Sequence, residues 1–227
     1  MNLIALGCLA ATIAIYMLTK RFYQKVPKLY FTPLLLTPAI VVLSLVLSGI
    51  PYESYHEGTH WLSDMIGPAT VALAVPLYKN MAVLKKHAFT VLVSVMSGAM
   101  VAILSSAWLA KELHLSTEIM ESLAPRSATT PIAMAVSQLT GGVPTITALF
   151  VLMTGLLGML IGPVIIRIFR IRNDIARGVL LGTSAHTAGT SKAFEFSSIS
   201  GSISSIAMIL TAFITLLITP WALQWFL

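Results

Sequence analysis

The stretch GVLLGTSAHTAGTSKAFE at residues 178–195 is nearly as apolar as a membrane span, yet it contains a histidine and several hydroxyl side chains. Four of its polar residues are spaced at i, i+3, i+4 and i+7, which predicts that they share one face of a helix: Thr183, His186, Thr187 and Thr190. Gly182 and Gly189 bracket this face, so we expect the helix to be weak, broken or closely packed. A hydrocarbon interior penalises polar side chains and unpaired backbone, so the segment is expected to face protein or a wet cavity. It is the first candidate for a ligand site.

The composition of the whole chain is that of an integral membrane protein. Its 227 residues are 57% hydrophobic and 10% charged, with a mean hydropathy of +0.89, whereas soluble domains average about a quarter charged residues. The basic residues lie in short loops between apolar runs, which indicates orientation in a bilayer and no nucleic-acid partner. The single cysteine, Cys8, and the scattered loop histidines give no metal-site spacing. We expect no cofactor, no bound metal and no enzymatic activity.

Five apolar runs are long enough to cross a bilayer, since about 20 residues span the hydrocarbon core: 2–19, 29–50, 88–110, 143–166 and 203–227. A sixth run, 65–78, is short and interrupted by glycine and prolines. The first run has no basic residue before it, so we expect a span and not a cleaved leader. Residues 51–64 are expected to form an acidic, aromatic loop, and a short surface helix is expected to begin near Ser116. The fold class is therefore all-α, with about six spans.

The loops differ sharply in charge. Eleven of the fourteen Lys and Arg residues fall in three loops, and six of the eight acids fall in two others. Positive loops stay cytoplasmic, which puts the N-terminus outside a cytoplasmic (inner) membrane and leaves the side of the C-terminus open. Residue 111 is then outside and the arginine-rich loop 167–177 inside, which requires an odd number of crossings between them. We therefore expect 125–142 to be re-entrant from outside and 178–195 to enter from the cytoplasm. In the alternative, 125–142 crosses and the arginine-rich loop lies outside.

The re-entrant candidate 125–142 has its own polar group. Arg126, Thr129, Thr130 and Ser137 are predicted to share one helical face. Pro131 has no N–H, so the backbone around it is expected to offer free amides and carbonyls to a small organic anion at a half-helix N-terminus. The alternative is a proline kink whose threonines bond back to the helix. The candidate substrate-binding residues of the two segments are Arg126, Ser127, Thr129, Thr130, Pro131, Thr183, Ser184, His186, Thr187, Gly189 and Thr190.

Two residues are candidates for proton coupling. His186 titrates near neutral pH and is able to exchange a proton with substrate; alternatively it makes only an interhelical hydrogen bond. Glu195 is the second candidate, and the alternative is an i, i+3 pair with Lys192 at the membrane boundary. A short match between 69–75 and 128–134, A-T-x-x-[LI]-A-[VM], suggests two inverted repeats, with halves 1–110 and 111–227 in a single domain 1–227.

Several motifs in their order resemble the LrgB/CidB/YohK family over essentially the whole chain. They are PYESY at 51–55, PATVALAVPLYKN at 68–80, PRSATTPIAMAV at 125–136, ARGVLLGTSAHTAGTSKAFE at 176–195 and SSIAMILTAFIT at 204–215. Arg126-Ser127 is similar to the CidB/YohK branch. The family's two motif segments fall on Thr129-Thr130-Pro131 and Ser184-Ala185-His186. Two departures affect the expected substrate range: relatives often have Asn-Pro at Thr32-Pro33 and Gly-Gly at Gly58-Thr59.

The resemblance implies two functions. Family members are labelled holin- or antiholin-like, modulating murein hydrolase activity and cell lysis with a small LrgA/CidA-type membrane partner. Relatives also include the plastidial glycolate/glycerate translocator, which implies a carrier for small monocarboxylates. We expect the carrier, working by alternating access as a homo-oligomer with the small partner; the alternatives are the lysis modulator and a structural subunit with no path of its own.

Overall fold

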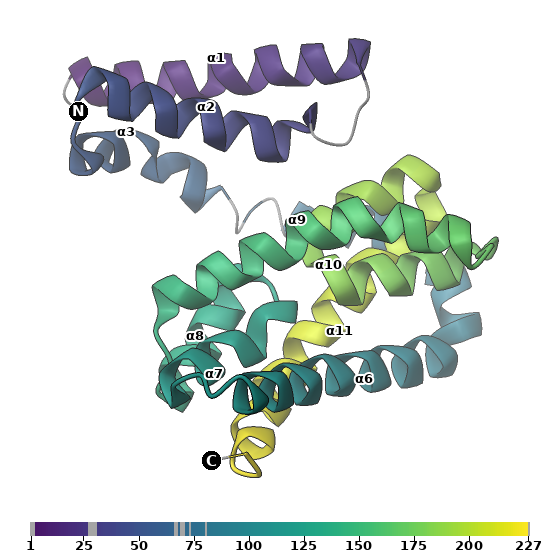
Figure 1. Ribbon diagram of the computed structural model, residues 1–227. Helices are drawn as coiled ribbons and strands as arrows, with labels where there is room; N and C mark the ends of the chain where they lie inside the picture. The colour runs from purple at the N-terminus through teal and green to yellow at the C-terminus, as the bar shows by residue number, and fades with distance from the viewer. Residues whose placement is uncertain are drawn as a thin grey trace. The chain divides into compact units, whose positions relative to one another are not determined.

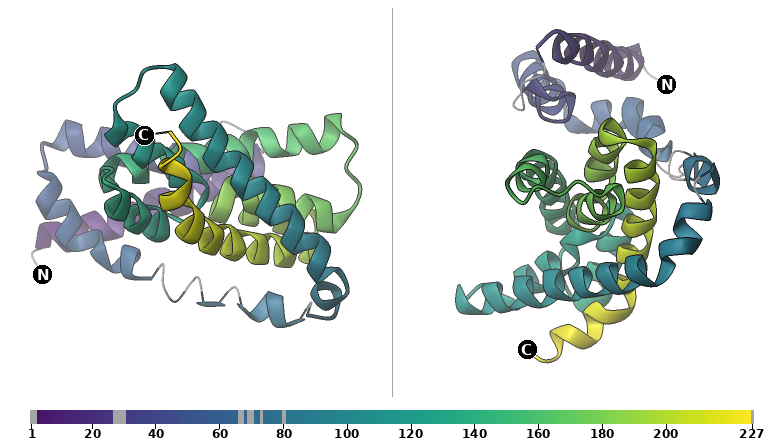
Figure 2. Two further views of the ribbon diagram at one scale, coloured as in Figure 1. Left: turned by 90° about the horizontal axis from the view of Figure 1, so that it is seen from below. Right: turned by 90° about the vertical axis from the view of Figure 1, so that its right-hand side faces the viewer.

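The computed structural model describes residues 3–26, 31–65, 68, 71–72, 74–79 and 81–226, and these residues form helices with no β-strand among them (Figures 1 and 2). Their contacts define two compact units, Met1–Ala72 and Leu73–Leu227. The all-α prediction is confirmed. The subdivision at residue 110 and the inverted repeat stay predictions, because part of the segment 69–75 lies outside the described residues.

The first unit contains α1 (Leu3–Lys25), α2 (Pro33–Ser48) and α3 (Tyr52–Asp64). Thr19 and Thr37 join α1 to α2 through a hydroxyl–hydroxyl bond of 2.8 Å. The predicted loop at 51–64 is wrong, since α3 fills it. A helix forms there because Glu53 favours the first turn electrostatically and Gly58 lets α3 pack directly on the backbone of α1 at Ala5.

The second unit contains every other element, in the chain order α5 (Ala74–Lys79), α6 (Met81–Glu112), α7 (Thr117–Leu123), the 3₁₀ turn η2 (Ala124–Ser127), α8 (Thr130–Thr140), α9 (Pro144–Ile168), α10 (Asp174–Phe196) and α11 (Ser198–Leu223). The short helix predicted after Ser116 is α7, although Met120, Glu121 and Ser122 on it are buried.

Four helices in the described part of the chain are long and apolar enough to cross a membrane: Ile4–Lys25, Lys85–Glu112, Pro144–Ile168 and Ser198–Leu223. A fifth apolar helix, Leu35–Ser48, is shorter. In the predicted run 65–78, α5 begins at Ala74, and residues 66, 67, 69, 70 and 73 lie outside the described residues. The chain is therefore a multi-pass membrane protein.

Helices α6 and α11 run in the same direction and form the frame of the second unit (Figure 1). Val91 and Val95 pack on Ile203 and Ala207 at one end, and Ala107 and Ala110 pack on Leu223 at the other. Helix α11 begins beside the start of α10, where the Ser200 hydroxyl donates to the Asp174 carbonyl at 3.0 Å. Helix α9 ends where α10 begins, so its two ends, at Pro144 and Ile168, mark the two ends of the unit.

The segment formed by η2 and α8, which we call the first hairpin (124–140), enters from the Pro144 end of α9 and returns to it. Before the hairpin, the Ser122 hydroxyl accepts the Val143 N–H at 2.8 Å. At its tip, Ala128 packs on Val151, one third of the way along α9. On the way back, the Thr147 hydroxyl donates to the Ser137 hydroxyl at 2.7 Å. The chain therefore enters and leaves the unit at the same end of α9, and re-entrance of 125–142 into a membrane from outside stays a prediction.

Helix α10, which we call the second hairpin, enters from the Ile168 end and reverses at His186, whose φ of 37° and ψ of −123° interrupt the helix. Its first arm (174–185) packs Leu181 beside Gly162 of α9. Its second arm (187–196) folds back along the first. Two contacts show this: Gly189 lies against Leu181, and the Phe196 ring centre is 5.3 Å from the Arg177 guanidinium. The two interrupted segments thus enter from opposite ends, as predicted.

Candidate functional site

The tips of the two hairpins meet at one residue of α9. Val151 is fully buried; its side chain packs with Ala128 of the first hairpin, and its carbonyl oxygen lies 2.9 Å from His186 Nε2 of the second. Ala212 of α11 packs against the same cluster. Two interrupted segments that are far apart in the sequence therefore end at the same depth inside the bundle.

His186 has a structural role that its position dictates. A carbonyl oxygen only accepts, so Nε2 must bear a proton and donate to Val151. The ring is buried, with 7% of the residue exposed, and it fits because α9 has Gly155 there: a Cβ at that position would lie 2.6 Å from the imidazole. This contact holds a non-glycine residue at positive φ, which costs about 1–3 kcal/mol. The interhelical hydrogen bond anticipated as the alternative is present.

Both hairpins place a helix N-terminus at their tips. Helix α8 begins at Thr130, the Thr129 side chain makes no capping bond, and Pro131 removes one N–H from the first turn. The second arm of α10 begins directly after His186. A helix N-terminus has unsatisfied amides and a partial positive charge of about half a unit. The tips therefore direct two positive ends toward the middle of the unit.

Arg126 lies beside the first tip and at the end of a groove of about 490 Å³. Thr154 of α9 and Ser184 of α10 line the same groove, so the structure brings Arg126 and Ser184 together from the two predicted segments. Arg126 is half-buried, and within the described residues it has no salt bridge and no hydrogen bond. An unpaired, partly desolvated guanidinium is a ready partner for a carboxylate.

The predicted shared face of Thr183, His186, Thr187 and Thr190 is wrong, because the helix stops at His186. Thr183 is on the first arm, where its hydroxyl donates to the Val179 carbonyl at 2.8 Å. Thr187 is exposed on the second arm, and Thr190 is buried 2.9 Å from the Ser204 hydroxyl of α11. Thr190 thus joins the second hairpin to a spanning helix.

The predicted shared face of Arg126, Thr129, Thr130 and Ser137 is also wrong, because α8 begins only at Thr130 and Arg126 belongs to η2. Ser137 is fully buried against α9. The remaining candidates are placed as follows: Ser127 is buried, Thr129 and Thr130 are partly exposed at the start of α8, Pro131 is exposed, and Gly189 is packed against the first arm.

Glu195 lies near the end of the second arm, where its exposed carboxylate pairs with Lys192. Proton coupling through Glu195 stays a prediction, and so does coupling through His186. No group of three His, Cys, Asp or Glu residues that is suited to a metal ion occurs in the described parts of the chain.

The sequence-based reasoning missed the contribution of α9. Gly155, Gly158 and Gly162 receive the second hairpin at His186, Ala185 and Leu181 in turn. A stripe of small residues on one face of a membrane helix is the signal of close helix packing, and this stripe was visible in the sequence.

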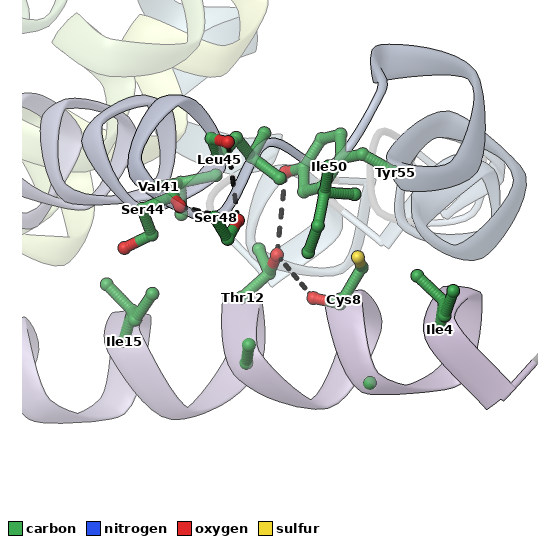
Figure 3. Close-up of a pocket in the computed structure, with 12 residues that line it drawn as sticks. Ile4, Cys8, Thr12, Ile15, Val41, Ser44, Leu45, Ser48, Ile50 and Tyr55 are labelled. Carbon is green, nitrogen blue, oxygen red and sulfur yellow. Dashed lines mark hydrogen bonds between the residues drawn. The ribbon is translucent and has the colours of Figure 1, made fainter.

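The first unit contains a separate pocket of about 300 Å³ between α1, α2 and α3 (Figure 3). Its lining is mostly aliphatic, and the Thr12 hydroxyl in it donates to the Cys8 carbonyl at 2.8 Å. No charged side chain lines it. Thr32, one of the two departures from the family pattern, is the N-cap residue of α2. It is buried, and its hydroxyl has no hydrogen-bond partner. The pocket therefore offers no positive charge to an anion.

Apolar spans joined by two opposed re-entrant hairpins define a polytopic membrane protein with an interior polar centre. Residues 12–225 match the model of the LrgB-like family, and the chain belongs to this family. It is 55% identical over 221 residues to the "Uncharacterized protein YwbG" of Bacillus subtilis, covering 97% of this chain and 98% of that one. It is 35% identical over 216 residues to the "Holin-like protein CidB" of Staphylococcus aureus, covering 95% and 94%. The "Uncharacterized protein YxaC" of B. subtilis is 34% identical over 209 residues, covering 92% and 91%. No solved structure matches the chain.

Proposed function

We propose that the chain is a carrier for small monocarboxylates of the pyruvate, lactate, glycolate or glycerate type, working by alternating access. The observation that supports this most is the meeting of two half-helix N-termini beside an unpaired Arg126 at the depth of Val151. Discontinuous helices whose N-termini point at an anion are the recurring binding device of secondary transporters.

The charge balance favours an anion. Two helix N-termini contribute about one positive charge between them, and Arg126 adds another. Helices α8, α9 and α11 contain no Asp or Glu, so no acidic side chain on them competes with a bound carboxylate. A carboxylate is therefore the ligand that neutralises this centre, with Arg126, Thr130 and Ser184 as its contacts.

The groove at Arg126 is much larger than a three-carbon acid, which leaves space for the hairpins to move. The hairpins enter from different ends of α9, so movement of one against the other opens the centre to one side at a time. Arginine-rich residues 167–177 belong in the cytoplasm, which puts the N-terminus outside the cytoplasmic membrane. A small LrgA/CidA-type membrane protein and further copies of the chain complete the assembly.

Uptake into proteoliposomes tests the proposal. Purified protein, with and without the small partner, is expected to show saturable uptake of at least one of labelled pyruvate, lactate, glycolate and glycerate. Arg126→Gln is expected to raise the concentration for half-maximal uptake about 10- to 100-fold, since a hydrogen bond to a charged group contributes about 1.5–3 kcal/mol. Thr130→Val is expected to reduce uptake with normal membrane insertion.

Arg172→Gln is the matched control, because Arg172 is exposed in the loop between α9 and α10. Its uptake is expected to equal that of the unmodified chain. Absence of saturable flux for all four acids, in the presence of the partner, removes the carrier function. Equal losses in Arg126→Gln and Arg172→Gln remove the binding role of Arg126.

The second candidate function is a holin-like modulator of murein hydrolase activity and lysis, which is favoured by the name of the S. aureus relative, "Holin-like protein CidB". Such an assembly makes large, poorly selective lesions. Release of dyes larger than a disaccharide from the same liposomes favours this function, and retention of those dyes during lactate uptake favours the carrier.

A further inference from the structure

Helix α6 has two exposed faces of opposite character at the same depth. Phe89, Val93 and Met96 form an apolar face, with Phe89 79% exposed. His87, Thr90 and Ser94 form the other face, and Thr90 and Ser94 are exposed as well. Lipid tails suit the first face, whereas the hydroxyl groups of the second face favour water or protein beside them. The second face is therefore the one suited to border a wet space.

The polar face of α6 lines a cavity of about 470 Å³ shared with the first arm of α10. Asn173, Ala176 and Val179 line the opposite wall. The cavity lies at the Ile168 end of the second unit, where α10 begins and where the N-terminal half of α6 lies (Figure 1). It is separate from the groove at Arg126 apart from Leu180, which lines both.

The charges around this cavity favour an anion. His87 lines it directly, and Lys85 and Lys86 precede His87 on α6. The nearest acid on α10, Asp174, is engaged by Arg177 at 3.4 Å and by the Ser200 hydroxyl at 3.2 Å. The Asn173 side chain accepts the Ile175 and Ala176 amides, so the helix start is capped. Among the described residues, Lys85 and Lys86 of α6 and Arg172 beside Asn173 have no acidic partner.

The polar face continues from the cavity toward the break in α10. Gly98 follows Ser94 by one turn, and a Cβ there would meet only Thr183, at 3.8 Å from its hydroxyl oxygen. Thr183 precedes His186 by less than one turn. Gly98 and Thr183 thus lie next to each other between the cavity and the break in α10, and no bulky side chain separates them.

We propose that the cavity between His87, Thr90 and Ser94 of α6 and the first arm of α10 is a water-filled vestibule that binds the small carboxylate on its path between the cytoplasm and the hairpin tips. This inference rests on the proposed carrier function. It adds a second, outer binding position to the transport path and assigns His87 as its hydrogen-bonding contact.

Thiol labelling tests the vestibule directly, because Cys8 is the only cysteine. In a Cys8→Ser background, S94C lies on the polar face and V93C, its neighbour in depth, lies on the apolar face. The anionic reagent sulfonatoethyl methanethiosulfonate is expected to modify S94C at least about tenfold faster than V93C, since a thiol in an apolar setting stays protonated and unreactive. The cationic trimethylammonium analogue is expected to react more slowly with S94C than the anionic reagent does, and the transported acid is expected to slow modification.

Two results overturn the vestibule: equal labelling of S94C and V93C in membrane vesicles of both orientations, or fast labelling that none of the four acids slows. T90C repeats the measurement if S94C does not assemble. The Cys8→Ser chain is assayed for uptake in parallel. If it transports an acid while S94C stays unreactive, only the vestibule is lost; if it transports none of the four acids, the carrier function itself is lost.

Discussion

The two hairpins reverse direction by different means. The first uses ordinary backbone: Ala128 (φ −82°, ψ 171°) and Thr129 (φ −66°, ψ 148°) are extended, and prolines stand at positions 125 and 131. The second reverses at His186 alone, at positive φ and without glycine. The local sequence determines the first reversal, because the prolines restrict the backbone there. The second depends on a tertiary contact with α9, so its integrity reports on packing across the bundle.

The hairpins are alike in how their returning arms are attached. Ser137 of the first pairs with Thr147 of α9, and Thr190 of the second pairs with Ser204 of α11. Each returning arm is therefore held to a different spanning helix by one buried hydroxyl pair. Relative movement of α9 and α11 would leave both hydroxyl pairs intact, but it would strain the His186–Val151 hydrogen bond between α10 and α9.

The largest effect is expected from closing the space inside the second hairpin. In Gly189→Ala, the added methyl group overlaps the backbone oxygen of Leu181 on the facing arm. Neither backbone moves without leaving α9 or α11, so we expect a loss of about 3 kcal/mol in the free energy of unfolding, the upper end of the usual cost of overpacking. Thermal unfolding in detergent, with size-exclusion chromatography of the folded fraction, measures it.

Gly98→Ala is the matched control, since its methyl group would make only ordinary contact with Thr183. Alanine is the better helix former by about 1 kcal/mol, so this variant is expected to be as stable as the unmodified chain or slightly more so. Equal stability of Gly189→Ala and Gly98→Ala contradicts the folded-back second arm.

The next effect concerns the relative stability of alanine and glycine variants at position 186, which we expect to be the reverse of the order in an ordinary helix. His186→Ala and His186→Gly both lose the hydrogen bond to Val151, but only glycine adopts φ 37° freely. We expect the glycine variant to be more stable by about 1–2 kcal/mol. In an uninterrupted helix glycine is the less stable by about 1 kcal/mol, so the sign measured by thermal unfolding decides whether α10 breaks here. Greater stability of the alanine variant shows a continuous helix.

Much of this difference between the two hairpins is predictable from the sequence. Loop charges and Pro131 were enough to predict that the chain reverses at the first hairpin, and the side of the membrane from which it enters stays a prediction. The glycines indicated an interruption in α10, but they lie in close contacts and not at the break: Gly182 packs on α11 and Gly189 on the first arm. The break occurs at His186 because Gly155 and the Val151 carbonyl receive its ring, and no local signal encodes a partner 35 residues away.

The candidate site was predicted in part for the same reason. Arg126 and Ser184 were identified as polar residues in interrupted segments, and the structure places both in one groove. The helical faces were wrong because each assumed a continuous helix through a reversal. Thr154 and Ser204 were missed because they belong to regular spans, where hydroxyl groups commonly bond back to their own helix.

The two buried hydroxyl pairs are expected to differ modestly in the stability that is lost when each is removed. In Ser137→Ala, Thr147 keeps its bond to the Val143 carbonyl at 3.2 Å, so the loss is about 0.5–1.5 kcal/mol. In Thr190→Val, Ser204 keeps no other hydrogen bond among the described contacts, and a buried unpaired hydroxyl costs about 1–3 kcal/mol. Thermal unfolding of both variants is expected to show the greater loss in Thr190→Val. The opposite order means that α11 does not hold the second arm.

The smallest effect concerns Glu121, at the mouth of the first hairpin outside the spans. Its carboxylate lies against Gly141, which ends α8 at φ 102°. Burial raises the pKa of Glu121 above its ordinary 4.5, and the neighbouring Glu118 carboxylate raises it further. A carboxyl with a higher pKa in the folded state stabilises the fold below the ordinary pKa, and this contribution is lost as the pH rises through the folded pKa.

Glu121→Gln removes that titration. The variant is expected to match the unmodified chain at about pH 4 and to exceed its stability at about pH 8. Unfolding temperatures across this range measure the widening difference. Glu118→Gln removes only the smaller of the two causes, so it is expected to shift the pH dependence less. The second hairpin has no buried acid at its mouth. If the unfolding temperatures of Glu121→Gln and the unmodified chain differ by the same amount at all pH values, this carboxyl does not distinguish the two hairpins.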